Sequence, residues 1–181
     1  MQVTETKLKD CFIIEPTIFG DERGYFFETF NKENFKELTG KEIEFVQDNE
    51  AFSNRGVLRG LHFQKGEFAQ AKLVRVVKGK VLDVVVDVRP NSKTFGQHFS
   101  CVLSEENKKQ LFVPRGFAHG YSVLEDHTVF VYKCDNFYQP KFEGGIIFND
   151  ETLNIDWMLS ENEIAVSEKD KVLKTFNELE I

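Results

Sequence analysis

The chain has 181 residues, of which 41% are hydrophobic and 29% charged, a balance typical of a globular protein. Its formal net charge of -7 excludes a general electrostatic match to nucleic acid, although basic residues can still converge locally on an anion. No stretch approaches the roughly 18 apolar residues that span a membrane. Cys11, Cys101 and Cys134 form no CxxC pair, so neither a disulfide framework nor a zinc knuckle is indicated.

The first ten residues lack the apolar core of a signal peptide, so we expect a cytoplasmic protein. The chain has no internal repeat, low-complexity segment or flexible linker, and we expect one domain over residues 1–181. Its 19 phenylalanines predict a substantial apolar core.

The N-terminal part of the chain predicts two strands and a helix. Residues 11–19 and 24–30 have the composition of strands, and the turn-forming sequence between them is GDERG. Residues 31–40 predict a short helix that begins at Asn31, places Phe35 and Leu38 on one side, and ends at Gly40.

Short strands dominate the rest. Residues 71–77 and 80–88 flank Lys78-Gly79-Lys80, which has the character of a hairpin turn. In the second of these strands one face is apolar, and the other alternates valine with Asp83 and Asp87. Further strands are predicted at 95–103, 109–114, 118–124 and 128–134, and residues 167–181 have the apolar stripe of a helix. Many short strands with peripheral and C-terminal helices favour a mainly β protein, a barrel or jelly roll.

The stretch VLRGLHFQ, residues 57–64, places Arg59 and His62 three residues apart. In an ideal strand these side chains point to opposite faces, but Gly60 lies between them and can host a bulge that redirects one. The stretch predicts either an electropositive site or an exposed basic edge strand, and the residues alone favour neither.

His119 follows Pro114 and Gly116 in a pattern that resembles the second motif of the cupin family, in which this histidine binds a metal. The earlier His-x-His of metal-binding cupins is absent, because His62 is followed by Phe63 and Gln64. A metal site of this class needs three or four ligands, so we expect none. We interpret His98 and His127 as surface residues.

Three further patterns are compatible with either a structural or a functional role. Tyr132 in a strand is usually a packing residue, and the spacing of Ser167 and Asp170 resembles a capping box. Polar residues between the aromatic residues near 19–52 suit a nucleotide, because arginine binds phosphate in a bidentate manner and Gln or Asn reads a base edge. Hydrogen bonding in a turn explains Asn49 equally well.

Nine stretches together resemble the dTDP-4-dehydrorhamnose 3,5-epimerase family, metal-free cupins. In chain order they read FGDERGYFFETF, FVQDN, VLRGLHFQ, QAKLVRVVKG, DVVVDVRPNSKTFG, PRGFAHGY, YKCDNFYQP, GGIIFNDETLNIDW and SEKD. The ordered set is specific and covers nearly the whole chain. It departs from the family at Cys134 and Val166, where other residues are usual, and the alignment is weaker near Lys169 than near His62.

The resemblance implies a cupin-type jelly-roll barrel and an isomerase that needs no cofactor. The implied reaction is epimerisation at C3 and C5 of dTDP-4-dehydro-6-deoxy-D-glucose, giving dTDP-4-dehydro-L-rhamnose. It implies that His62 is the general base, that Asp170 orients it, that Tyr132 is the proton donor and that Lys72 lies beside the sugar's 4-oxo group.

The resemblance also implies a substrate-binding set and a homodimer with exchanged N-terminal strands, so that part of the Arg23–Glu28 stretch would serve the partner's site. Three members would lie near the diphosphate and sugar, four would bind the nucleotide, with Tyr138 stacking on it, and the rest would contact other parts of the substrate. The set is Arg23, Phe26, Glu28, Gln47, Asn49, Arg59, His119, Tyr138, Glu143 and Lys169.

Three rival interpretations remain: an epimerase that inverts only C3 or only C5, a non-enzymatic sugar-binding cupin, and a metal-dependent cupin isomerase or dioxygenase. The residues do not separate the first from the double epimerase. The absent His-x-His argues against the third, and we expect no nucleic-acid or membrane partner.

Overall fold

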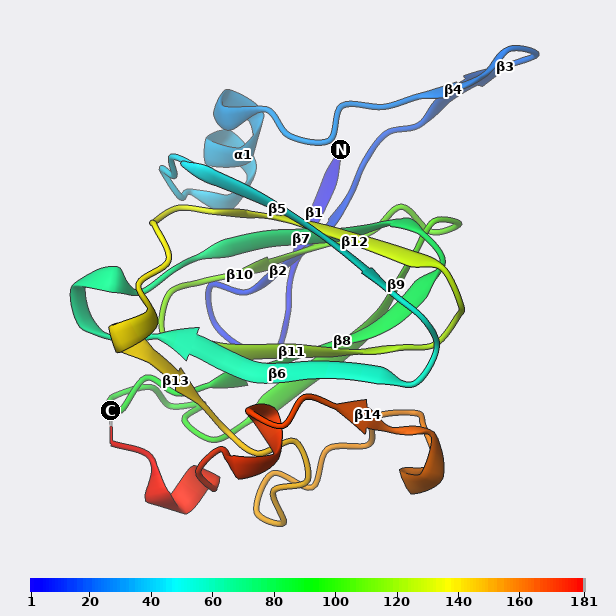
Figure 1. Cartoon of the computed structure of the whole chain (residues 1–181). Helices are drawn as coiled ribbons and strands as arrows, with labels where there is room; N and C mark the ends of the chain where they lie inside the picture. Colours follow the sequence, from blue (N-terminus) through cyan, green and yellow to red (C-terminus); the bar gives the residue numbers. More distant parts are fainter. Residues whose placement is uncertain (181) are drawn as a thin grey trace.

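Two β-sheets face each other in the computed structural model of the chain, which describes residues 1–180 (Figure 1). The first sheet has the order β1-β2-β10-β7-β12-β5 and contains β1 (Gln2–Glu5), β2 (Phe12–Glu15), β5 (Gln47–Ser53), β7 (Lys72–Lys78), β10 (Gln110–Val113) and β12 (Thr128–Cys134). The second has the order β13-β6-β11-β8-β9 and contains β6 (Val57–Gln64), β8 (Lys80–Asp87), β9 (His98–Ser104), β11 (Phe117–Val123) and β13 (Glu143–Gly145). This arrangement confirms the mainly β, jelly-roll prediction.

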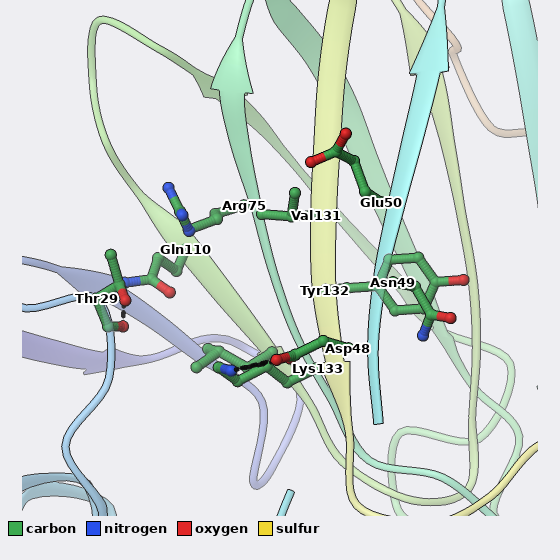
Figure 2. A pocket seen from close by; sticks show the side chains of 10 residues that line it. Thr29, Asp48, Asn49, Glu50, Arg75, Gln110, Val131, Tyr132 and Lys133 are labelled. Carbon is green, nitrogen blue, oxygen red and sulfur yellow. Dashed lines mark hydrogen bonds and ion pairs between the residues drawn. The ribbon is translucent and has the colours of Figure 1, made fainter. Parts of the chain in front are cut away.

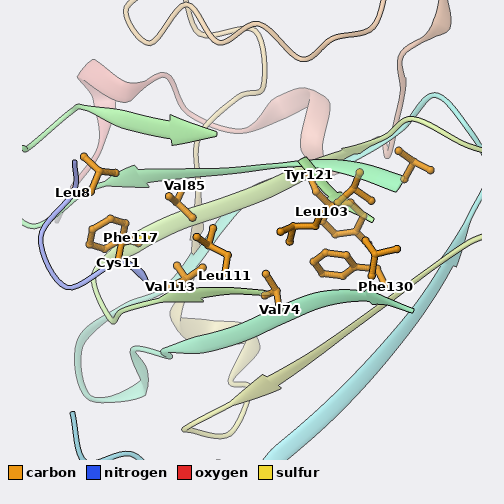
Figure 3. Packing of buried hydrophobic residues seen from close by; sticks show 13 residues of the cluster. Leu8, Cys11, Val74, Val85, Leu103, Leu111, Val113, Phe117, Tyr121 and Phe130 are labelled. Atoms are coloured by element: carbon orange, nitrogen blue, oxygen red, sulfur yellow. The ribbon is translucent and has the colours of Figure 1, made fainter. Parts of the chain in front are cut away.

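The main apolar cluster fills the space between the sheets (Figure 3). Strand β8 shows why the sequence alternates: Val81 and Val85 point into this cluster, whereas Leu82, Val84 and Val86 belong to a second cluster on the outer side of the second sheet. Both faces of β8 are therefore buried, including the mixed face that carries Asp83 and Asp87.

Other parts of the chain cover the outer face of the second sheet and one end of the outer face of the first. The C-terminal segment lies under the second sheet and adds Leu153 and Trp157 to the second cluster (Figure 1). Helix α1 (Lys32–Thr39) packs beside the first sheet, where Phe35 joins a third cluster. The Asn31 side chain accepts hydrogen bonds from the first turn and Gly40 ends the helix, as predicted, but Leu38 is exposed rather than packed beside Phe35.

The predicted N-terminal strands form a shorter, projecting hairpin. Strand β2 ends at Glu15 because Pro16 has no N–H to continue the ladder. Strands β3 (Phe19–Asp21) and β4 (Gly24–Phe26) then pair only with each other and form an arm that extends away from the two sheets (Figure 1). The aromatic residues Phe19, Tyr25 and Phe26 on this arm are exposed, so not every phenylalanine contributes to the core.

The hairpin predicted at Lys78-Gly79-Lys80 is wrong. Strands β7 and β8 follow each other in sequence but belong to different sheets, so this turn carries the chain from one sheet to the other. Gly79 has a φ of 79°, and a side chain there would collide with Thr128. A local turn signal identifies the turn but not the strand with which each arm pairs.

The C-terminal segment is not the continuous helix that its apolar stripe predicted. It contains two short 3₁₀ turns, Asp170–Val172 and Phe176–Glu178, with extended backbone between them. The amide of Ile147 donates to the Lys174 carbonyl and that of Phe176 donates to Asp150. These bonds to distant residues occupy backbone groups that would otherwise form the hydrogen bonds of a helix. Val172, which belongs to the predicted apolar stripe, is exposed.

Candidate active site

A bulge in β6 directs Arg59 and His62 into the same space between the sheets. Opposite β11, His62 pairs with His119 and Arg59 pairs with Tyr121, so Gly60 and Leu61 together face only Gly120. Gly60 has a φ of 120°, and a Cβ atom there would lie 2.5 Å from the Gly120 Cα. Only glycine fits this position, and the predicted bulge is confirmed.

Both side chains line a cavity of about 590 Å³. Opposite them the first sheet contributes Lys72 from β7 and Tyr132 from β12, and the segment after β14 (Ala165–Val166) contributes Asp170. The four residues to which the sequence assigned the chemistry thus line one cavity, His62 on one sheet and Tyr132 on the other.

His62 and Asp170 form a hydrogen-bonded pair. The His62 Nε2 atom lies 2.7 Å from Oδ1 of Asp170, and Oδ2 of the same carboxylate accepts from the Gly60 N–H. Burial alone would raise the pKa of Asp170, but the hydrogen bond and charge of His62 outweigh it and hold that pKa below its usual value. An ionised carboxylate only accepts hydrogen bonds, so His62 carries its proton on Nε2 and leaves Nδ1 as the basic nitrogen.

The capping interpretation of Asp170 is half right. The backbone N–H of Asp170 donates to Ser167 Oγ, as in a capping box, but the carboxylate turns away to His62 instead of bonding back to the turn. The spacing of Ser167 and Asp170 predicted the turn and not the job of the side chain.

Lys72 and Tyr132 are neighbours on the first sheet. The Lys72 Nζ atom lies 6.0 Å from the centre of the Tyr132 ring, and in the ladder Lys72 pairs with Cys134. Burial lowers the pKa of Lys72, partly opposed by the nearby Cys134, Asp83 and Glu143. Burial also raises the pKa of Tyr132, so its hydroxyl holds a proton that it can donate.

His119 forms a second histidine–carboxylate pair that the sequence did not predict. Its Nε2 atom lies 2.9 Å from Oδ2 of Asp83 on β8, and both residues are buried. Asp83 within the valine run of β8 could have indicated this pair in the sequence, because a buried carboxylate requires a partner.

A second cavity of about 290 Å³ shares His62, Lys72 and Tyr132 with the first. Its lining includes Gln47, Asn49, Tyr138 and Glu143. One Glu143 oxygen accepts from the Tyr138 hydroxyl at 2.7 Å and pairs with Lys169 Nζ at 2.5 Å. Seven residues of the predicted binding set therefore line the two cavities around the four central ones. Gln47, Asn49, Tyr138 and Glu143 line the smaller cavity, and His119, Lys169 and Arg59, which donates to Ser53 Oγ, line the larger one.

Three members of that set do not line either cavity of this chain. Arg23 and Phe26 lie on the projecting arm, where Arg23 forms an ion pair with Asp21. Glu28 accepts hydrogen bonds from Asn31 and Asn34 beside the start of α1. That this stretch serves a partner's site stays a prediction.

The two remaining histidines differ in their exposure to solvent. His127 is exposed, as predicted, whereas His98 is half-buried, and its Nδ1 has no partner among residues 1–180. Within the described part of the chain no group of three or more His, Cys, Asp or Glu side chains is arranged to hold a metal ion. None of its helices is long and apolar enough to cross a membrane.

Another hollow, of about 320 Å³, lies at the outer side of the first sheet (Figure 2). In this view Arg75, Gln110 and Thr29 lie to one side, and the ion pair between Lys133 and Asp48 lies lower in the picture. Exposed Phe52 and Val77 lie on the strands that also carry Glu50 and Arg75, two residues away from each. This side of the sheet is thus only partly polar.

Comparison with known proteins gives a consistent result. A family model described as dTDP-4-dehydrorhamnose 3,5-epimerase matches residues 5–178. The dTDP-4-dehydrorhamnose 3,5-epimerase of Escherichia coli is 50% identical over 179 residues, which cover 99% of this chain and 96% of that one.

Solved structures agree in fold over almost the full length. A dTDP-4-dehydrorhamnose 3,5-epimerase from Elizabethkingia anophelis is 56% identical, with a TM-score of 0.95, and the match covers 98% of this chain and 97% of that one. A dTDP-6-deoxy-D-glucose-3,5-epimerase from Legionella pneumophila, solved in complex with dTDP-4-keto-L-rhamnose, is 46% identical, with a TM-score of 0.95, covering 99% of this chain and 94% of that one.

Proposed function

The chain belongs to the dTDP-4-dehydrorhamnose 3,5-epimerase family, and on this premise we propose which of its residues carry out the reaction. It is an isomerase that acts on a dTDP-sugar. Its reaction inverts C3 and C5 of dTDP-4-dehydro-6-deoxy-D-glucose. The observation that carries the assignment of roles is the His62–Asp170 pair, which faces Tyr132 and Lys72 across one cavity.

The first step is removal of a proton beside the 4-oxo group. That carbonyl acidifies the hydrogens on C3 and C5, because the resulting negative charge moves to its oxygen. Nδ1 of His62 takes the proton, and the Asp170 carboxylate on Nε2 stabilises the imidazolium that forms. Lys72 lies beside the enolate oxygen and stabilises its developing charge.

The second step returns a proton from the other side. Tyr132 projects from the first sheet and His62 from the second, so a sugar ring between them meets one group on each face. Donation by the Tyr132 hydroxyl inverts the carbon. The first inversion leaves His62 as an imidazolium and Tyr132 as a phenolate, so solvent water must take the proton from His62 and return one to Tyr132. The reset pair then acts at the second carbon. No electron leaves the sugar, so no redox cofactor is required.

We propose that Arg59, which lines the larger cavity, binds the diphosphate. A charged hydrogen bond of this kind is worth about 1.5–3 kcal/mol, so Arg59→Leu should weaken binding of dTDP about 10- to 150-fold. Isothermal titration with dTDP measures the change, and unaltered affinity would remove Arg59 from the diphosphate site.

The function is tested by incubating the protein with dTDP-4-dehydro-6-deoxy-D-glucose in deuterated water and following the sugar by NMR. Deuterium at both C3 and C5 with inverted configuration is expected. His62→Ala should reduce turnover roughly 10²–10⁴-fold, whereas His127→Asn, an exposed histidine with a φ of 58°, should turn over like the parent. Inversion at one carbon would identify a single-site epimerase, and no turnover would support the sugar-binding alternative.

Independence from metal remains a prediction, motivated by the absent His-x-His. Dialysis against a chelator should leave turnover unchanged. A large loss that zinc, iron or manganese restores would contradict the proton-transfer scheme.

We further propose a homodimer in which the β3–β4 arm of one copy reaches the cavity of the other. Two observations support it: the arm carries Arg23 and exposed Phe26 away from its own cavities, and the outer face of the first sheet exposes Phe52 and Val77. Exposed aromatic residues on a projecting arm are typical of an interaction surface.

Light scattering tests this dimer. Phe52→Glu should shift the mass toward that of the monomer and weaken dTDP binding, because each site would lose the partner's arm. Val172→Glu, at an apolar residue that is 81% exposed near the C-terminus, should do neither. A parent protein that is monomeric but fully active would contradict the proposal.

We also propose a cellular compartment and a domain organisation for the protein. The three cysteines are unpaired, which supports a reducing compartment such as the cytoplasm. All three apolar clusters flank the same pair of sheets, which supports a single domain over residues 1–181.

A further inference from the structure

Three cross-strand pairs form one wall of the smaller cavity. In the first sheet Cys134 on β12 lies opposite Gln47 on β5 and Lys72 on β7, and Tyr132 lies opposite Asn49. Gln47 and Asn49 are two residues apart on one strand, so their side chains share a face, and Asn49 is the diagonal neighbour of Cys134. All of these side chains line the cavity.

A chain of hydrogen bonds connects them. The Tyr138 backbone N–H donates to Gln47 Oε1 at 3.3 Å, Gln47 Nε2 donates to Asn49 Oδ1 at 3.0 Å, and Asn49 Nδ2 donates to the Cys134 Sγ at 3.7 Å. We call this chain the amide relay.

The direction of the amide relay is fixed from one end. A backbone N–H only donates, so the oxygen of Gln47 must face Tyr138 and its nitrogen must face Asn49. The oxygen of Asn49 therefore faces Gln47, and its nitrogen faces the sulfur. Each amide has two N–H groups and uses one in the relay, which leaves the other for the cavity.

We propose that Cys134 is a positioning residue, whose sulfur ends the amide relay and holds the remaining N–H of Asn49, with that of Gln47, toward an acceptor oxygen of the bound nucleotide. This inference rests on the proposed function, because it deepens the role of two residues in the binding set. The acceptor is either a carbonyl of the pyrimidine base or an oxygen of the diphosphate.

The surroundings of Cys134 suit this role. The residue is buried, so packing holds its sulfur in place beside Asn49. Burial raises the pKa of the Cys134 thiol to about 11, although the nearby Lys72 opposes it, so the sulfur stays protonated near neutral pH. A thiol is a weak acceptor, and a small but measurable effect on binding is therefore expected.

A matched pair of variants tests the proposal by titration with dTDP. Valine and threonine have nearly the same shape, but only threonine keeps an acceptor for the Asn49 N–H. Cys134→Val should weaken dTDP binding about 2- to 10-fold, and Cys134→Thr should bind like the parent. Cys101→Val, at a cysteine of β9 that lines neither cavity, is the control and should change nothing.

A double-mutant cycle shows whether the effect passes through Asn49. Asn49→Ala removes the amide that Cys134 positions, so adding Cys134→Val to it should cost no further affinity. Equal losses in the valine and threonine variants, no loss in either, or a full additional loss beside Asn49→Ala would each overturn the proposal. Thermal unfolding of every variant separates a folding defect from a binding defect. If the valine variant is unstable, Cys134→Ala, which also lacks a side-chain acceptor, replaces it beside threonine and in the cycle.

Smaller ligands identify the acceptor. If the base accepts the N–H groups, the loss persists with thymidine monophosphate, and if the diphosphate accepts them, it persists with inorganic diphosphate. Absence of the loss with both ligands, when dTDP shows it, would overturn the placement of the donors. Failure of the proposed function is distinguishable, because then the parent protein itself would not bind dTDP.

Discussion

Oδ1 of Asp170 lies 2.7 Å from Nε2 of His62, although 108 residues separate them in the chain. The parallel pairing of β14 with the start of β6 explains how they meet, because Ala165 and Val166 lie beside Val57 and Leu58. The turn that follows β14 then delivers Asp170 to the bulge that directs His62. The Asp170 carboxylate is buried, and the His62 ring is its only side-chain partner from the catalytic group. The two residues therefore act as a unit.

Asp170→Asn tests that unit. The amide keeps the shape but not the negative charge, so the imidazolium that forms on His62 loses its stabilisation. We expect turnover to fall roughly 10²–10⁴-fold with little change in dTDP affinity. Glu168→Gln, at an exposed carboxylate two residues away, is the control. Parental turnover in Asp170→Asn would show that the pair is structural only.

Features determined by neighbouring residues could be read from the sequence. Asn31 and Gly40 begin and end a helix through their own side-chain and backbone chemistry, and the alternation of β8 follows from the period of a strand. The bulge at Gly60 was also predictable. Arg59 and His62 would point to opposite faces of a regular strand, and a glycine between them can host a bulge that brings them to the same face. The resemblance to a known family supplied the roles of the site residues.

Features that depend on distant partners could not be read. The turn at Gly79 is visible in the sequence, but whether it joins paired strands depends on β10 and β11, which come later. Asp170 has the spacing of a capping residue, and only the position of β6 decides that its carboxylate binds His62. Asp83 shows the same limit, because a carboxylate in a valine run indicates a partner but does not name His119.

Gly60→Ala should disrupt both the fold and the site. The added Cβ would meet the Gly120 Cα at 2.5 Å, and a φ of 120° is unfavourable for alanine. We expect a loss of about 2–5 kcal/mol in the free energy of unfolding, measured with urea. Gly40→Ala, also at positive φ but with open space around it, should lose only about 1 kcal/mol. Equal losses would mean that the strand relaxes at Gly60 and that the bulge is not required.

Tyr121→Phe should stabilise the protein. The Tyr121 hydroxyl is buried, finds no hydrogen-bond partner within residues 1–180, and its ring stacks on Phe130 with centroids 4.1 Å apart. Phenylalanine keeps the stacking and removes the unsatisfied group, so we expect a gain of about 1 kcal/mol. Tyr138→Phe, which loses a hydroxyl bonded to Glu143, should show no gain. A loss of stability in Tyr121→Phe would reveal an ordered water or other partner at this hydroxyl.

Asp87 should contribute to stability in a pH-dependent manner. Burial alone would raise its pKa, but hydrogen bonds from Arg89, Ser92 and Thr94 outweigh burial and hold the pKa at about 2, against a usual 3.8. A lowered carboxyl pKa stabilises the fold above about pH 4, and that stabilisation is lost as the pH falls toward 2. Asp87→Asn should therefore be about 2 kcal/mol less stable near pH 7, and the gap from the parent should narrow on acidification. Glu22→Gln, at an exposed carboxylate, should follow the parent throughout, and a gap for Asp87→Asn that does not change with pH would contradict the linkage.

Tyr132→Phe separates the proton donor from the base. His62 lies on β6 and Tyr132 on β12, in opposing sheets, so each reaches one face of the sugar. Without the phenol, His62 still removes a proton and returns a deuteron to the same face. We therefore expect Tyr132→Phe to exchange the C3 and C5 hydrogens with deuterated water while inversion falls roughly 10²–10⁴-fold.

His62→Ala should lose exchange and inversion together, because no base then starts the reaction. NMR measures both quantities in one sample, deuterium content from the vanished proton signals and configuration from the couplings that remain. The control is Phe130→Leu, which alters the packing beside Tyr132 but leaves both reactive groups and should slow exchange and inversion equally. Two outcomes would refute the assigned roles: exchange in His62→Ala at the parental rate, or normal inversion in Tyr132→Phe.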